Sequence, residues 1–111
     1  MEHSIAVDML SALAHHTRLS IFKLLVKAGP EGMPAGEIAR ALDVAAPTLS
    51  FHLSHLSNAG LVKAERRSRS IVYAASYADM NRLLTYLTAE CCQAGNTGVE
   101  NDEEDACQSQ C

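Results

Sequence analysis

Apolar residues recur at helical spacing through the N-terminal part of the chain. In residues 4–14 they share one helical face, at Ile5, Met9, Leu10, Ala12 and Leu13. Residues 17–29 repeat the pattern with Leu19, Phe22, Leu25 and Val26, and Gly29-Pro30 is a strong helix stop. The pattern predicts two consecutive helices, followed by a connector over residues 31–33.

Two shorter helical segments come next, over residues 34–42 and 47–60. Pro34 lies near the start of the first, where a missing N–H is harmless, and Pro47 lies in the first turn of the second. Gly60 follows as the C-terminal cap of the second segment. Because a turn of about four residues joins these two short helices, they predict a helix-turn-helix.

The period of the pattern changes after Gly60. Residues 61–66 and 70–76 are β-branched and aromatic runs on either side of Arg67-Ser68-Arg69, which predicts a β-hairpin. Ser76 is then expected to cap a helix over residues 77–92, in which one apolar stripe holds Met80, Leu83, Leu84, Leu87 and Cys91.

The order of these elements predicts a mainly α fold with a β-hairpin wing, a winged helix-turn-helix. Residues 1–92 are expected to form one DNA-binding and dimerisation domain, because 111 residues make a single modest core that dimerisation would help. From Gln93 onward periodicity stops, and residues 93–111 are expected to form a flexible acidic tail.

Charge is segregated along the chain, although the formal net charge is only −4. Residues 90–111 contain six acidic residues and no Lys or Arg, whereas residues 1–89 hold all nine basic residues against seven acidic ones. The predicted hairpin concentrates Lys63, Arg66, Arg67 and Arg69 around Glu65 alone. Such asymmetry suggests a nucleic-acid binder with an acidic appendage.

The helix over residues 47–60 has two distinct faces. Winding it at about 100° per residue turns Leu49, Leu53 and Leu56 toward the body. The opposite side carries Thr48, Phe51, Ser54 and His55, with Ser50 and His52 on its flanks. Short polar side chains suit base edges and phosphates, and Phe51 suits a thymine methyl. The alternative for Phe51 and His52 is packing against the neighbouring helix or the hairpin.

We therefore expect double-stranded operator DNA as a partner of the second helix and the hairpin. An arm with Arg67 and Arg69 at its tip would reach phosphates or an adjacent minor groove. The expected DNA-contacting residues are Thr48, Ser50, Phe51, His52, His55, Lys63, Arg66, Arg67 and Arg69.

The segment from Leu10 to Ser76 resembles the ArsR/SmtB family of metal- and metalloid-responsive repressors. The resemblance is carried by "LAHHTRLSIFKLL", by "IARALDVAAPTLSFHLSHLSNAGLV" and by a wing ending in "VYAAS". It implies a homodimer formed through the first and last helices. It also implies that Thr48, Ser50, His52 and His55 belong to the DNA-reading helix. One departure is Ser68 at the wing tip, where a glycine is common.

All four cysteines of the chain lie at its C-terminal end, at Cys91, Cys92, Cys107 and Cys111. The Cys-x-Cys pair that many arsenic sensors of this family carry is absent from the first helix of the helix-turn-helix. The last helix offers Asp79 and Glu90 but no His for a zinc-type site. The adjacent Cys91-Cys92 pair resembles a subgroup of arsenic repressors, which implies As(III) or Sb(III) as inducer. Soft thiolates favour such ions. Three thiolates would supply the ligand set, either from Cys91, Cys92 and one of Cys107 and Cys111, or with ligands shared across the dimer.

Other interpretations of the cysteines stay open. In the first, Cys91 is a packing residue of the apolar stripe at the dimer interface. In the second, Cys91 or Cys92 forms a disulfide with a tail cysteine and acts as a redox switch. In the third, all four thiolates hold a zinc ion. An enzyme is the poorest alternative, since no His or Lys is near enough in sequence to activate the thiols. No phosphate-cradling glycine loop or carboxylate pair is present that would offer another active site, and no organic cofactor is expected.

The sequence contains neither an apolar run of membrane-spanning length nor a signal-peptide pattern. We therefore expect a cytoplasmic protein without a membrane partner.

Overall fold

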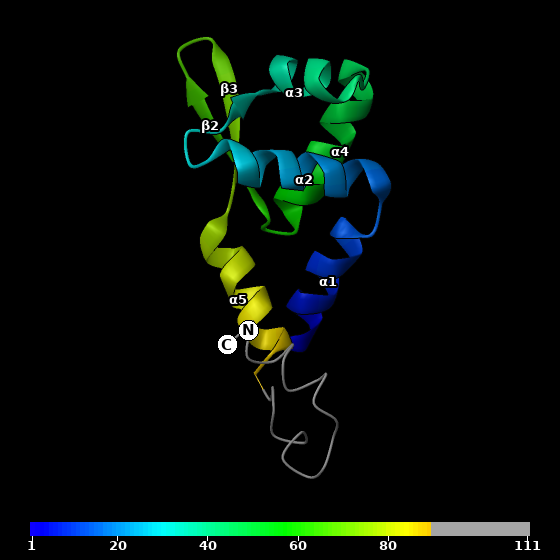
Figure 1. The fold of residues 1–111 in the computed structure, drawn as a ribbon, viewed down its shortest axis with the longest axis vertical. Coiled ribbons are helices and arrows are strands. Elements are labelled where there is room, and N and C mark those ends of the chain that lie inside the picture. Colours follow the sequence, from blue (N-terminus) through cyan, green and yellow to red (C-terminus); the bar gives the residue numbers. More distant parts are fainter. Residues whose placement is uncertain (90–111) are drawn as a thin grey trace.

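The computed structural model describes residues 1–89, which form five helices and three short strands (Figure 1). In chain order these are α1 (His3–Leu13), α2 (His16–Ala28), β1 (Met33–Pro34), α3 (Ala35–Leu42), α4 (Ala46–Asn58), β2 (Val62–Arg67), β3 (Ser70–Ala75) and α5 (Tyr77–Leu87). This is the winged helix-turn-helix that the hydrophobic pattern predicts. The proposed tail, 93–111, lies outside the described residues.

The elements separate into two ends of the protomer, as Figure 1 shows. Helices α3 and α4 and the β2–β3 hairpin gather at one end, and α2 crosses α4 in the middle of the molecule. Helices α1 and α5 extend together toward the other end, where the imidazole Nδ1 of His3 and the hydroxyl of Tyr86 share a hydrogen bond of 2.8 Å. The first and last helices of the described chain therefore pack against each other.

The helix-turn-helix consists of α3 and α4, joined by a tight turn. Asp43 caps α3 in the left-handed conformation, with φ of 56°. The end of α4 is closed by Gly60, with φ of 84°. The Leu61 amide donates to the Leu56 carbonyl and the Gly60 amide to the Ser57 carbonyl, both at 3.0 Å. These two bonds form a Schellman motif, which confirms Gly60 as the cap predicted from sequence.

The core joins both ends of the protomer. The buried row of α4, which is Leu49, Leu53 and Leu56, packs in one cluster with residues from α1, α2, α3 and α5. Met9, Ile21, Leu25 and Ile38 are buried in the same cluster. The predicted orientation of the leucine row of α4 is confirmed.

The wing is a regular antiparallel hairpin. Strands β2 and β3 pair from Val62 opposite Ala75 to Arg67 opposite Ser70. Ser68 and Arg69 form the two-residue loop, and Ser68 has φ of 59°. A positive φ at the first loop position is a feature of type II′ turns, which usually place glycine there. The structure thus accommodates Ser68 in the conformation that glycine favours.

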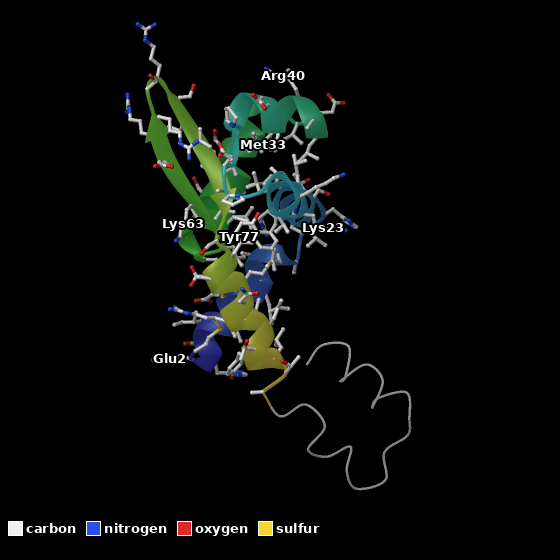
Figure 2. The ribbon with its side chains drawn as sticks, turned by 60° about the vertical axis from the view of Figure 1, so that its left-hand side comes forward. Glu2, Lys23, Met33, Arg40, Lys63 and Tyr77 are labelled. Carbon is white, nitrogen blue, oxygen red and sulfur yellow. The ribbon has the colours of Figure 1, made fainter. Side chains whose placement is uncertain are left out.

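A third strand, β1, corrects the prediction of a simple connector at residues 31–33. Met33 pairs with Tyr73 and Pro34 with Val72, so β3 is the central strand; Figure 2 shows Met33 beside the hairpin. Gly32, with φ of 77°, allows this approach, because a Cβ there would lie 2.5 Å from the Tyr73 carbonyl oxygen. A two-residue strand containing proline has no period for a sequence pattern to reveal.

Helix α5 starts as predicted and ends earlier than predicted. Ser76 occupies the N-cap position, but its hydroxyl donates to the Asp79 carboxylate at 2.6 Å and makes no side-chain cap to the backbone. The hydroxyl of Tyr77 donates to the Val26 carbonyl at 2.9 Å, which fixes the start of α5 to the end of α2. Thr88 and Ala89 form a turn, so the predicted continuation of the helix is wrong there; residues 90–92 lie outside the described part.

Candidate nucleic-acid interface

One face of α4 presents small polar side chains to solvent. Thr48, Ser50, Ser54 and His55 are exposed there, while the leucine row lies on the opposite side. Hydroxyls and an imidazole offer both donors and acceptors, as base edges and phosphates require. The structure places Thr48, Ser50 and His55 where the sequence predicts them, and their contact with DNA stays a prediction.

Phe51 is the most exposed large apolar residue of this face, at 60% of its surface. Its ring meets the ring of His55 edge-on, with centroids 4.6 Å apart, and lies 5.6 Å from that of His52. Two imidazoles therefore brace an outward aromatic side chain. An apolar ring held in this position can contact a thymine methyl.

His52 is buried, which corrects its predicted place on the flank of the exposed face. Only 6% of its surface is accessible, and its ring lies 4.6 Å from that of His15 between centroids. A guanidinium Nη1 of Arg18 lies 3.3 Å from His52 Nδ1. Because a guanidinium only donates, Nδ1 accepts and the imidazole is neutral. His52 therefore matches the packing alternative for this residue.

Burial and charge both keep His52 neutral. Desolvation lowers the pKa of His52 from its ordinary value, and the neighbouring His15, Arg18 and His55 lower it further. The sequence pattern missed Arg18, the hydrogen-bond partner of His52. The two residues are 34 positions apart, and no local period connects the start of α2 with the middle of α4.

The four cationic side chains of the hairpin differ in whether they are already paired with a carboxylate. Lys63, Arg66, Arg67 and Arg69 are all exposed, and Figure 2 shows Lys63 near the base of the hairpin. Arg67 bonds the Glu65 carboxylate at 3.0 Å and reaches the Glu31 carbonyl at 3.5 Å. Among the ion pairs within residues 1–89, it is the only hairpin cation that takes part. Arg66 and Arg69 are therefore better placed than Arg67 to meet phosphates.

Comparison with known proteins agrees with this geometry. Residues 13–65 match a family model described as a helix-turn-helix domain. The chain is 30% identical over 82 residues to the HTH-type transcriptional regulator YgaV of Escherichia coli K12, covering 74% of this chain and 81% of that protein. It is 33% identical over 84 residues to a biofilm growth-associated repressor of Agrobacterium fabrum, covering 76% and 69%.

Solved structures share the same fold over most of the chain. An ArsR-like transcriptional regulator from Rhodococcus sp. RHA1 superposes with a TM-score of 0.74 at 25% identity, covering 86% of this chain and 87% of that one. The chain belongs to the ArsR family. The homodimeric winged helix-turn-helix domain of Mb0332 from Mycobacterium bovis gives 0.65 at 25% identity, covering 87% of each chain. Reduced HlyU from Vibrio cholerae gives 0.61 at 30% identity, covering 76% and 88%.

As an ArsR-family protein, the chain is a DNA-binding transcriptional repressor of the ArsR and HlyU type.

The end of the protomer that is opposite to α4 and the hairpin has a different surface. Ile5 and Leu10 of α1 and Leu84 and Leu87 of α5 are exposed by 41–52%, although each was predicted on an apolar stripe. We call these four residues the α1/α5 surface. Leu84 also borders an apolar groove of about 480 Å³ between α2 and α5.

The predicted metalloid ligands Cys91, Cys92, Cys107 and Cys111 lie outside the described residues. Within residues 1–89 no group of three His, Cys, Asp or Glu side chains is close enough to hold a metal ion. None of the helices described in this ArsR-family chain is long and apolar enough to cross a membrane.

Proposed function

We propose that this repressor is a homodimer that releases operator DNA when As(III) or Sb(III) is bound by cysteine thiolates. The ligands are Cys91, Cys92 and one of Cys107 and Cys111. The observation that carries the proposal is an adjacent cysteine pair four positions after Leu87, the last residue of α5. Trivalent arsenic and antimony are soft and thiophilic, and soft thiolates select such ions over hard cations.

The binding reaction changes neither charge nor oxidation state. Arsenite near neutral pH is mainly As(OH)₃, and each arsenic–sulfur bond forms as one hydroxyl leaves with a thiol proton as water. Three such exchanges give a neutral arsenic tris-thiolate. Electrostatic repulsion of DNA therefore cannot cause release, so a change of geometry must.

The position of α5 indicates which geometry changes. Cys91 follows Leu87 by four residues, and four residues of chain span at most about 14 Å. Leu87 itself belongs to the α1/α5 surface, at the end of the protomer away from α4 and the hairpin (Figure 1). Ligand binding at this end would alter how two protomers meet, without contacting the recognition helix.

The α1/α5 surface is also the proposed dimer interface. Exposed leucine and isoleucine on two neighbouring helices favour a self-complementary contact, and the similar domain of Mb0332 is homodimeric. A two-fold axis through this surface would present two α4 helices to one face of DNA. The expected operator is an inverted repeat with half-sites about one helical turn apart.

The test uses full-length protein kept reduced by a phosphine and a duplex that this protein selects from a randomised library. Arsenite or antimonite should release the duplex, as measured by fluorescence anisotropy. Cys91→Ser and Cys92→Ser should each bind DNA normally and fail to respond. Deletion of the residues after Gly95 should weaken the response. Release of the serine variants by arsenite would refute the thiolate site, and full response of the truncated protein would refute a third thiolate.

A thiol redox switch is the second candidate function. It is favoured by the similarity to HlyU, one of whose solved structures is of a reduced form. Oxidation would join Cys91 or Cys92 to a tail cysteine, with two electrons and two protons passing to a peroxide. Release by peroxide, and none by arsenite under reductant, would select this function. Release by Zn²⁺ alone would select a zinc-responsive regulator.

A further inference from the structure

Arg18 stands between the two ends of the protomer, in the first turn of α2. Its Nε donates to the carbonyl of Ala12 at 2.6 Å, and its Nη1 donates to Nδ1 of His52 at 3.3 Å. Ala12 belongs to α1 and His52 to α4. Because the guanidinium is planar and rigid, these two bonds fix the end of α1 relative to the middle of α4.

We propose that Arg18 is a positioning residue that couples the α1/α5 end to the recognition helix α4 through His52. The regulatory part of this inference rests on the function proposed above, in which an inducer acts on the α1/α5 surface. The positioning part rests on contacts within residues 1–89 and on DNA binding by α4.

The α1 side of the contact is a helix C-terminus. The carbonyl of Ala12 is among the last four of α1, which have no intrahelical donor. The neighbouring carbonyls of Ser11 and Leu13 accept from the Ala14 and His15 amides, and Arg18 supplies the donor for Ala12. A cation at this end also complements the helix dipole. A shift of α1 along its axis would therefore move the guanidinium or break its bond.

The α4 side of the contact reaches the DNA-reading face. His52 is buried between the leucine row and the exposed row of α4, and its ring touches that of Phe51. Phe51 in turn packs edge-on against His55. A displacement of His52 would thus reorient the two bulkiest exposed side chains of α4.

A continuous set of contacts leads from α5 to this point. Tyr86 of α5 bonds His3 of α1. Arg18 bonds the carbonyl of Ala12 in the last turn of α1 and also bonds His52 of α4. Spatial continuity alone does not establish coupling, so the proposal requires energetic evidence. The protonation of His52 gives an experimental means of obtaining that evidence.

Arg18 and His52 can bond only while His52 is neutral, since a protonated imidazole has no acceptor at Nδ1. The charged or titratable groups that act on His52 are His15 and Arg18 from the α2 side and His55 from α4. Neither ion pair found within residues 1–89 brings a carboxylate to this cluster. Acid would therefore place a cation beside Arg18 and open the contact.

The test compares His52→Asn with His52→Gln on the selected duplex. The Oδ1 of asparagine takes nearly the place of Nδ1 and accepts from Arg18, whereas the longer glutamine places its amide near Nε2. At pH 8 we expect His52→Asn to bind within about threefold of wild type and His52→Gln about tenfold more weakly. Between pH 8 and pH 5.5 the ratio of wild-type to His52→Asn affinity should fall, because acid can charge His52 but not the asparagine. Both proteins retain His55, so any contribution of His55 is common to the two.

Arg18→Gln separates positioning from direct phosphate contact. We expect about tenfold weaker binding with an unchanged slope of log affinity against log salt, whereas loss of a phosphate contact lowers the slope by about one. A lower slope, or equal DNA affinity of the Asn and Gln variants, would overturn the proposal. The Asn–Gln comparison decides it even where Arg18→Gln fails to fold. Failure of wild-type protein to select any duplex would instead refute the proposed function.

Discussion

The two ends of the protomer expose opposite kinds of surface. The end with α4 and the hairpin presents hydroxyls, the His55 imidazole and arginines, with Phe51 as its one large exposed aromatic on α4. The end with α1 and α5 presents Ile5, Leu10, Leu84 and Leu87. A polar, cationic surface suits DNA, and exposed aliphatic side chains suit another protein surface. Under the proposed function, DNA binding and assembly of the dimer are therefore separate tasks of separate ends.

The largest effect should follow from breaking the apolar end. Leu84→Asp combined with Leu87→Asp should give a monomer and weaken binding to the selected duplex by about 100-fold, because a dimer binds two half-sites as linked contacts. Sedimentation velocity and anisotropy measure the two effects. Thr85→Asp, which adds a charge to the same helix at a position outside the α1/α5 surface, is the control. A double variant that remains dimeric would exclude this surface as the interface.

The next effect concerns the cationic end. Arg66→Ala combined with Arg69→Ala should weaken binding by about tenfold or more at 0.15 M salt and lower the salt slope by about two. Arg67→Ala should have a smaller effect, since Glu65 already pairs with that guanidinium. Arg82→Ala, a change of the same kind on α5, should leave both quantities unchanged. Equal losses for the single variants Arg67→Ala and Arg69→Ala would show that the Glu65 pair opens on DNA.

Sequence reasoning succeeded where the determining contacts are local. The leucine row of α4 and the Gly60 cap follow from spacing along one helix, and the hairpin follows from two runs about a short loop. At α1 the same reasoning named an apolar face, but it could not distinguish a contact with the protein's own core from a surface left exposed. Met9 and Ala12 are buried, whereas Ile5 and Leu10 are exposed.

The candidate site was less completely predictable. Side chains that point outward from α4 and the hairpin follow from helical winding and strand alternation. His52 bonds Arg18, 34 positions earlier, and Met33 pairs with Tyr73, 40 positions later. Contacts at such separations are set by tertiary packing, which a periodic pattern does not encode. The proposed ligation by three cysteine thiolates rests on the chemistry of soft ligands.

A smaller effect is expected at the junction between α4 and the hairpin. Gly60→Ala should lower the free energy of unfolding by about 1 kcal/mol, because an L-residue is strained in the left-handed region. The added Cβ would meet nothing within 4 Å, so backbone strain alone is measured. Gly36→Ala, inside α3, is the control and should stabilise the protein by a few tenths to about 1 kcal/mol. Urea unfolding measures both, and a neutral Gly60→Ala would show that the junction relaxes.

The smallest effect is a pH dependence of stability located at the DNA-binding end. The pKa of the buried His52 is lowered from 6.5, so over the window below 6.5 the unfolded chain binds more protons at this residue than the folded one. The free energy of unfolding should therefore rise as the pH is raised through that window. His52→Asn should flatten this part of the profile. Leu53→Ala, which destabilises the same helix and retains His52, should preserve its shape at lower overall stability. An unchanged profile for His52→Asn would mean that His52 binds protons equally in the folded and unfolded states, and that its burial in α4 does not alter its protonation.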